Sequence, residues 1–170
     1  MSNLLDSASI VLTPTAYDNG RMLSVKPSVA LGPELVTNGD FIGNISPWVG
    51  TNINTTFSPL LFTNTSTNGS IRQGFTTIVG EEYKLSINIS LGNWAIHASI
   101  NENTGGSLGN ITSSGSLYFK ATTTTTYVLC YLIGSTGTEG SIDNVSVKED
   151  ISGDFDFSRN SAATRVNAQG

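Results

Sequence analysis

The chain has 170 residues, a formal net charge of −5 and a hydrophobic fraction of 38%. This length and apolar content suffice for one buried domain with additional segments; they exclude two large domains, and they exclude a disordered chain, which combines low hydrophobicity with high net charge. The eight lysines and arginines form no cluster, which excludes a basic nucleic-acid footprint, and the single cysteine excludes an internal disulfide.

Charged residues make up only 12% of the chain, and Ser, Thr, Asn and Gly take their place. Such a composition favours a β protein whose exposed strand faces carry hydroxyl and amide groups. Residues 1–9 lack a basic region followed by an apolar core with a cleavage site, and no apolar run approaches the ~20 residues of a membrane span. We therefore expect synthesis in a cytoplasm and no membrane span.

Residues 1–32 are predicted to form an N-terminal hairpin arm. Asp18-Asn19-Gly20 stands between two apolar stretches, and Asn-Gly favours a tight hairpin turn because both central residues adopt positive φ. A two-stranded piece cannot bury a core of its own, so it must pack on the rest of the chain or on a partner. The side chains expected at this contact are Ile10, Val11, Leu12, Tyr17 and Met22.

Residues 33–150 are predicted to form an antiparallel β-sandwich. Apolar and polar residues alternate strictly over 83–91, again over 94–100, and again over 117–121, which is typical of half-buried strands. Turns rich in Gly, Ser, Thr and Asn separate these stretches, and no amphipathic helix is evident.

Two stretches of this domain depart from simple alternation. Residues 126–133 are apolar on both faces, which predicts a central strand covered on both sides or one covered by a neighbouring subunit, with Cys130 buried in it. Between Ile142 and Val145 the apolar positions slip out of phase, and a β-bulge at Asp143-Asn144 would explain the slip.

Residues 151–170 are predicted to contain a C-terminal strand that completes the anchor region. Phe155 and Phe157 alternate with polar residues, and they join the apolar residues of the arm as expected contacts. The ending Ala168-Gln169-Gly170 has the composition of a turn without its second strand. One inference is that the natural chain continues into a further domain; the other is that only part of it is represented.

The central segment resembles the galactose-binding-like jelly rolls of carbohydrate-binding module families four, nine and twenty-two. The matching stretches, in the order of those families, are Asn38-Gly39-Asp40-Phe41 with Trp48, Ile71-Arg72-Gln73, 80–87 and the closing 142–147. The resemblance implies an all-β jelly roll and a capacity to bind glycans.

The two ends of the chain resemble a different group, the tail-fibre and other virion proteins of bacteriophages. The matching stretches are 3–20 with 24–27, and 154–167. The second stretch often follows directly after the first in such proteins, so the resemblance implies that the jelly roll is inserted between two halves of one anchor region. Insertion is tolerated where the ends of the guest lie close together.

Catalytic signals are sparse, and we expect no enzymatic activity. His97 is the single histidine, and the chain has no nucleophile elbow, phosphate-binding loop or paired metal ligands. Glycan binding needs exposed aromatic rings with polar groups beside them. The polar faces of the predicted strands offer Tyr118, His97, Asn88 and Lys84 as candidates for glycan binding. Trp48 is a further candidate ring, although the pattern around Trp48 and Trp94 favours a place in the core for both tryptophans.

A structural calcium ion is common in the resembled modules, and no other cofactor is expected. Carboxylates of the opening and closing strands supply its oxygen ligands, and Asp40 and Asp143 stand near those positions. The acidic residue that often follows the opening Phe is Ile42 in this chain. That departure weakens the expectation of a calcium site.

The sequence therefore predicts a bacteriophage virion structural protein, such as a tail-fibre, head-fibre or decoration component. Its flanks would bind other virion proteins, its jelly roll would project and bind a host cell-surface glycan, and its expected assembly is a homotrimer because the resembled fibres are trimers. Two alternatives stay open at this point. One is a stand-alone carbohydrate-binding module, and the other is the N-terminal part of a larger depolymerase-type enzyme.

Overall fold

The computed structural model describes residues 16–18, 21–23 and 30–151. In the arm, β1 (Ala16–Asp18) pairs antiparallel with β2 (Arg21–Leu23), with Tyr17 opposite Met22. This is the predicted hairpin pairing. The other proposed anchor residues, Ile10, Val11, Leu12, Phe155 and Phe157, lie outside the described residues, and so does the predicted C-terminal strand.

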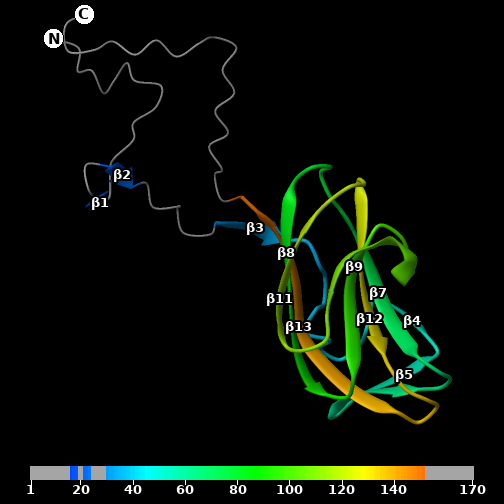
Figure 1. The fold of residues 1–170 in the computed structure, drawn as a ribbon. Coiled ribbons are helices and arrows are strands. Elements are labelled where there is room, and N and C mark those ends of the chain that lie inside the picture. Colours follow the sequence, from blue (N-terminus) through cyan, green and yellow to red (C-terminus); the bar gives the residue numbers. More distant parts are fainter. Residues whose placement is uncertain (1–15, 19–20, 24–29, 152–170) are drawn as a thin grey trace, which may run out of the picture. The chain divides into compact units, whose positions relative to one another are not determined.

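Residues 30–151 form an antiparallel β-sandwich jelly roll, as predicted (Figure 1). One sheet has the strand order β10-β9-β12-β7-β4; the other has the order β11-β8-β13-β6-β5, with β3 paired to β13. The strands of the first sheet are β4 (Val49–Thr51), β7 (Gly69–Thr76), β9 (Trp94–Ser99), β10 (Ser107–Ile111) and β12 (Thr125–Leu132). Those of the second are β3 (Leu31–Glu34), β5 (Ile53–Phe57), β6 (Leu60–Asn64), β8 (Glu82–Leu91), β11 (Gly115–Lys120) and β13 (Glu139–Asp150).

Helical structure in the described part of the chain is confined to the short 3-10 helix η2 (Thr104–Gly106), between β9 and β10. No helix of that part is long and apolar enough to cross a membrane.

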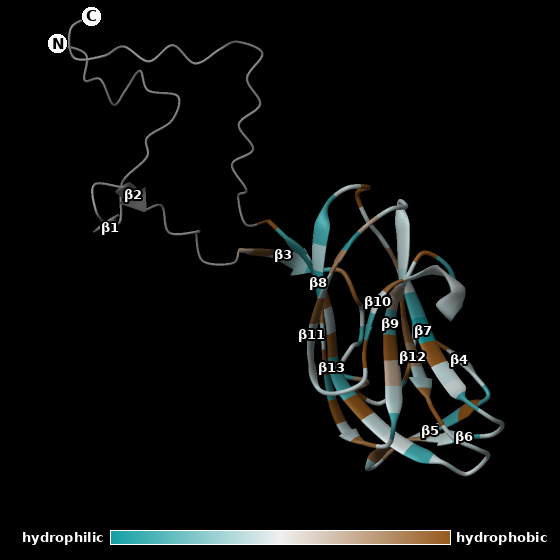
Figure 2. Ribbon diagram, viewed as in Figure 1, coloured by the Kyte–Doolittle hydropathy of each residue, from teal (hydrophilic) through white to brown (hydrophobic). Residues whose placement is uncertain are grey.

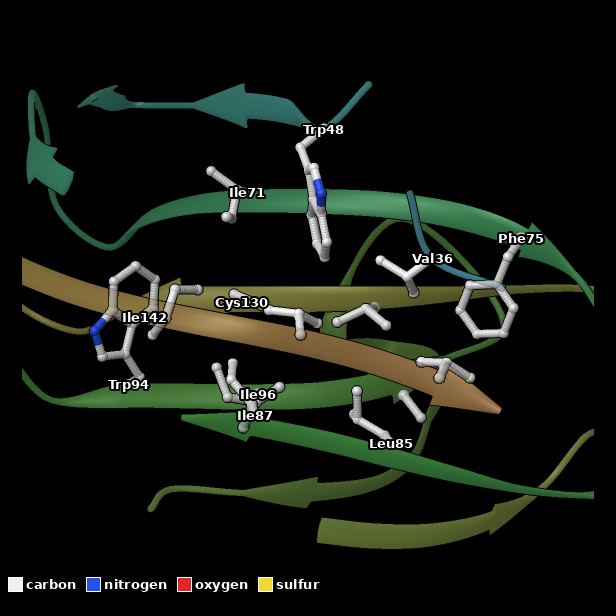
Figure 3. Close-up of a cluster of buried hydrophobic side chains, with 14 of the residues drawn as sticks. Val36, Trp48, Ile71, Phe75, Leu85, Ile87, Trp94, Ile96, Cys130 and Ile142 are labelled. Carbon is white, nitrogen blue, oxygen red and sulfur yellow. The ribbon is translucent and has the colours of Figure 1, made fainter. Parts of the chain in front are cut away.

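The core lies between the two sheets, and alternation along the strands decides what enters it (Figure 2). Figure 3 shows Leu85, Ile87 and Ile142 from one sheet facing Ile71 and Ile96 from the other. Four aromatic rings run in a row through this layer, with centroids 5.3 to 5.6 Å apart between neighbours. In order they are Trp48, Phe41, Phe62 and Trp94.

β12 is a central strand, paired with β7 on one side and β9 on the other. Cys130 points into the core from it and is fully buried, and burial raises the pKa of its thiol well above the usual range. The prediction of a buried cysteine is therefore confirmed.

The two motifs that open and close the domain meet each other. The predicted β-bulge is present, because the pairing of β13 with β8 gains one residue between Asp143 and Ser146 and Asn144 has a φ of 53°. The N–H of Val145 donates to the carbonyl of Gly39 at 2.9 Å. A Cβ at Gly39 would collide with the carbonyl oxygen of Val145, so this approach requires glycine.

The beginning and the end of this body lie side by side. β3 pairs antiparallel with the last residues of β13, with Leu31 opposite Asp150. The N–H of Ile151 donates to the carbonyl of Ala30 at 2.9 Å. The chain therefore enters and leaves the sandwich at adjacent points of one sheet.

Candidate functional site

The outer side of the five-stranded sheet carries an unusual set of side chains, which we call the tyrosine face. It is formed by the residues of β7, β9 and β12 that alternate with core residues, and their register places them in rows across the sheet. Leu129 lies between His97 and Arg72, and Tyr127 lies between Ser99 and Gly74. The members of the tyrosine face are Arg72, Gly74, His97, Tyr127, Leu129 and Tyr131.

An ion pair crosses this face. The Nη2 atom of Arg72 lies 3.0 Å from Oε2 of Glu102, and its Nε donates to the same oxygen at 3.1 Å. Its Nη1 donates to the hydroxyl of Thr51 on β4 at 3.0 Å. Arg72 on β7 is thus tied both to the neighbouring β4 and to the loop that follows β9, which fixes the guanidinium in position.

Tyr127 lies directly over Gly74. A Cβ added at Gly74 would stand 2.9 Å from Cε1 and 3.2 Å from Cδ1 of the ring, closer than such atoms normally approach. Glycine in the middle of a strand weakens the strand, and it marks places where another group approaches the backbone closely. Here that group is the aromatic ring, which stays partly exposed to solvent.

A groove of about 590 Å³ opens beside this ring. Tyr127, Arg72 and Glu102 border it, so an aromatic ring and a paired guanidinium and carboxylate meet at one hollow. Its other lining residues are Glu34, Leu35, Thr37, Pro47, Val49, Gln73, Gly74, Phe75 and Thr76. The wall on the side of Thr37 is held by Gln73, whose side-chain amide accepts from Thr37 N–H at 2.7 Å and donates to Thr37 C=O at 2.8 Å.

The centre of the tyrosine face is packed rather than solvated. Leu129 points away from the sandwich core, yet it is only 1% exposed. Its cross-strand neighbours are His97 and Arg72, and Tyr127 and Tyr131 stand two positions away on the same side of β12. Neighbours at these positions lie within reach of long and aromatic side chains, so they cover the leucine.

His97 lies at the far side of this face from the groove residues of β7. Its Nδ1 lies 3.1 Å from the hydroxyl of Ser107, and its ring meets the Tyr131 ring edge-on at 6.2 Å. Partial burial lowers its pKa below 6.5. In the described part of the chain no carboxylate hydrogen-bonds to this histidine, so the orienting member of a catalytic triad is missing there.

The structure brings Lys84 and Tyr118 together but separates His97 from them. His97 belongs to the tyrosine face, whereas Lys84 and Asn88 on β8 and Tyr118 on β11 point outward from the other sheet. His97 therefore does not share a face with Asn88 or Tyr118, because β9 belongs to one sheet and β8 and β11 belong to the other.

Trp48 also lies apart from the other predicted residues. It is only 4% exposed, its ring packs against Phe41, and its Nε1 donates to the carbonyls of Thr37 and Asn38 at 3.0 and 3.1 Å. A ring in this position supports the core and offers no surface on which a sugar could stack. Trp48 is therefore corrected from a glycan candidate to a core residue.

Sequence reasoning missed Tyr127, Tyr131 and Arg72. The signal was present, because two tyrosines four residues apart on one strand share a face, and Tyr carries a polar tip that suits a half-exposed position. That face was interpreted as apolar cover instead.

The two carboxylates proposed for calcium have different surroundings in the structure. Asp40 lines a shallow depression of about 320 Å³ with Glu34, Asn144 and Ser146, and Asp143 is not part of its lining. The Asp143 carboxylate instead accepts the N–H of Asn144 at 2.7 Å. Among the residues that the structure describes, no group of three or more His, Cys, Asp or Glu side chains could hold a metal ion.

Several solved structures resemble this one in fold. A family 61 carbohydrate-binding module in complex with β-1,4-galactotriose has 13% sequence identity and a TM-score of 0.47, and the match covers 68% of this chain and 98% of that one. A family 4 module has 13% identity, a TM-score of 0.46, and coverage of 66% and 98%. The enzymatically active domain of tailspike protein 4 from bacteriophage CBA120 has 13% identity and a TM-score of 0.46, with coverage of 68% of this chain and 21% of that one. No family model and no curated protein sequence matches the chain.

Proposed function

We propose that this protein is a non-catalytic, glycan-binding component of a bacteriophage particle, and that the tyrosine face with its groove is the binding site. The observation that carries the glycan part is the meeting of the Tyr127 ring, Arg72 and Glu102 at one groove. Sugars present apolar C–H faces that pack on aromatic rings, and hydroxyl groups that need donors and acceptors. The groove supplies both kinds of contact.

The Arg72 and Tyr127 side chains of the groove are held in place before a ligand binds. Arg72 is held by Glu102 and Thr51, and the Tyr127 ring rests on Gly74, so neither side chain needs to be ordered on binding. A site that is already ordered loses less conformational entropy when it binds. The Glu102 side chain is 58% exposed, so its carboxylate can still accept a hydrogen bond from a hydroxyl group of a ligand.

The experiment is calorimetric titration of the full chain with host envelope glycans selected on a glycan array. Tyr127→Ala is expected to weaken binding by roughly tenfold or more, the loss of ~1.4 kcal/mol. Tyr118→Ala, on the opposite sheet, is the matched control and should bind a neutral glycan as the wild type does. Equal losses in both variants, or no binding to any envelope glycan, would contradict the assignment.

The attachment part of the proposal rests on the adjacent entry and exit of the sandwich at Ala30 and Ile151. A domain with neighbouring ends can be inserted without separating the two halves of its host. The flanking segments, which resemble virion proteins, then form one attachment region, and a trimer is the assembly proposed for it.

Deleting residues 1–29, which leaves β3 and the Ala30–Ile151 hydrogen bond intact, tests this attachment. The truncated protein should lose its incorporation into particles while its calorimetric glycan binding persists. Incorporation that survives the deletion would favour a stand-alone carbohydrate-binding module. Light scattering of the full chain would test the trimer.

A further inference from the structure

The outer side of the six-stranded sheet carries two lysines that directly face each other. We call this surface the lysine face, formed by the outward residues of β8, β11 and β13. Lys84 on β8 lies opposite Lys148 on β13, and both are partly buried. Like charges at directly opposed positions of an antiparallel pair destabilise the sheet. Its residues include Lys84, Ser86, Ser116, Tyr118, Lys120, Ser146 and Lys148, together with Glu82.

The distribution of cations over the body is uneven. Its cationic side chains, apart from the single histidine, are Arg72, Lys84, Lys120 and Lys148. Arg72 is in an ion pair on the tyrosine face, and the three lysines all belong to the lysine face. The three lysines of the folded body therefore lie on one side of the sandwich, in a chain with a net charge of −5.

An exposed ring and a row of hydroxyls accompany these lysines. Tyr118 is 43% exposed, and the Nζ of Lys84 lies 5.7 Å from its ring centroid. In the next row Ser86 stands opposite Ser116 on one side and opposite Ser146 on the other. Two ammonium groups, an aromatic ring and hydroxyl donors thus occupy neighbouring positions.

Carboxylates also lie on this face, with Glu82 on β8 directly opposite Lys120 on β11. Glu34 stands opposite Lys148, but its Oε1 accepts from the N–H groups of Val36 and Val147 at 3.2 and 2.8 Å, and its Oε2 accepts from the Ser146 hydroxyl at 2.5 Å. Within the part of the chain that the structure describes, Arg72–Glu102 is the ion pair formed, and none involves Lys84 or Lys148.

We propose that the lysine face is a second binding site, separate from the groove, and that its ligand is an acidic polysaccharide. A carboxylate or sulfate group between Lys84 and Lys148 relieves their repulsion and gains charge-assisted hydrogen bonds. Tyr118 packs on the sugar that carries this group, and the serine row binds its hydroxyls. The exposed ring and the hydroxyls favour a polysaccharide over other polyanions.

The test uses two polyanions, each with an uncharged partner of the same backbone. Polygalacturonate is compared with its fully methyl-esterified form, and dextran sulfate with dextran, by calorimetry on the full chain. Binding is expected for the charged member of at least one pair, absent for its uncharged partner, and weaker at high salt. The double variant Lys84→Gln with Lys148→Gln should weaken it by roughly tenfold or more.

Matched variants separate this site from the groove. Lys84→Arg with Lys148→Arg keeps the charges and should retain binding, and Arg72→Gln removes a cation from the other sheet and should not affect it. Thermal melting checks that each variant is folded. Binding that ignores esterification and sulfation, that survives the double Gln variant, or that is absent for both polyanions would overturn the proposal. A loss caused by Tyr127→Ala would assign the polyanion to the groove instead.

Discussion

The two outer faces of the sandwich are built on different principles, although the same alternation produces both. The tyrosine face buries Leu129 under a layer of larger side chains and places its cation, Arg72, in an ion pair. On the lysine face Lys84 and Lys148 are directly opposed, and no ion pair with a described residue involves either of them. One face is packed and preorganised, and the other carries two directly opposed lysines. The difference shows that a two-layer sandwich can carry two chemically distinct surfaces over one shared core.

The largest expected effect tests whether the tyrosine face is packed. Leu129→Ala should lower the free energy of unfolding by about 2–3 kcal/mol, as truncation of a buried leucine does. Lys84→Ala, at the corresponding central position of the other face, should change it by less than ~0.5 kcal/mol. Urea denaturation of the two variants measures both values. Similar losses would remove the contrast between the faces.

A smaller effect tests the support beneath the Tyr127 ring. Gly74→Ala places a methyl group where the ring now lies, so the ring must shift and glycan binding should weaken roughly fivefold, or ~1 kcal/mol. Stability should change little, because alanine is otherwise favoured over glycine within a strand. Calorimetry and thermal melting together separate these outcomes, with Ser116→Ala on the opposite face as control. Unchanged affinity would mean that the ring position is unimportant for binding.

The third expected effect concerns pH. Burial lowers the pKa of His97 below its ordinary value of 6.5, so the unfolded chain binds this proton more readily than the folded one. The contribution of His97 to stability is therefore fully present above pH 6.5 and is lost as the pH falls through the folded-state pKa. Urea midpoints of the wild type and His97→Gln are compared above and below pH 6.5. The midpoint of the wild type should fall more than that of the variant when the pH drops below 6.5. Parallel curves would show that the histidine is solvated like an exposed one.

The smallest expected effect is that of chelation. Because no group of three or more His, Cys, Asp or Glu side chains among the described residues could hold a metal ion, EDTA should leave the melting temperature of the full chain unchanged. Added calcium should leave it unchanged as well. A rise in melting temperature with calcium would restore the metal site expected from the resemblance.

Much of the fold could be predicted because successive side chains of a strand point to opposite faces, so alternation in the sequence indicates which side chains are buried. Tyr83, Leu85 and Ile87 alternate with polar residues, and the structure buries all three. The bulge beside Asn144 was predicted from a slip in the same pattern. At the ends of strands the pattern fails: Ile100, expected inside, is 38% exposed, because the chain turns after Ser99 and the Ile100 N–H donates to the carbonyl of Gly106.

The site could be predicted only in part, for a physical reason. Alternation tells whether a side chain points inward or outward, but it does not tell which of two sheets holds the strand. Tyr118 and His97 are both outward residues and were grouped together, yet their strands belong to opposite sheets. The pairing of Tyr127 with Gly74 depends on the register of β12 against β7, which is set by contacts distant in sequence.

The hydrogen bond between Ala30 and Ile151 has a mechanical consequence. Because β3 and β13 are antiparallel and both chain ends leave from the same end of the pair, a pull that separates the flanks peels the strands apart one hydrogen bond at a time. Such peeling begins at low force, whereas shearing would load every bond of the pair at once. If both flanks are held at a single point, no force separates them, and a load applied to the sandwich does not peel β3 from β13.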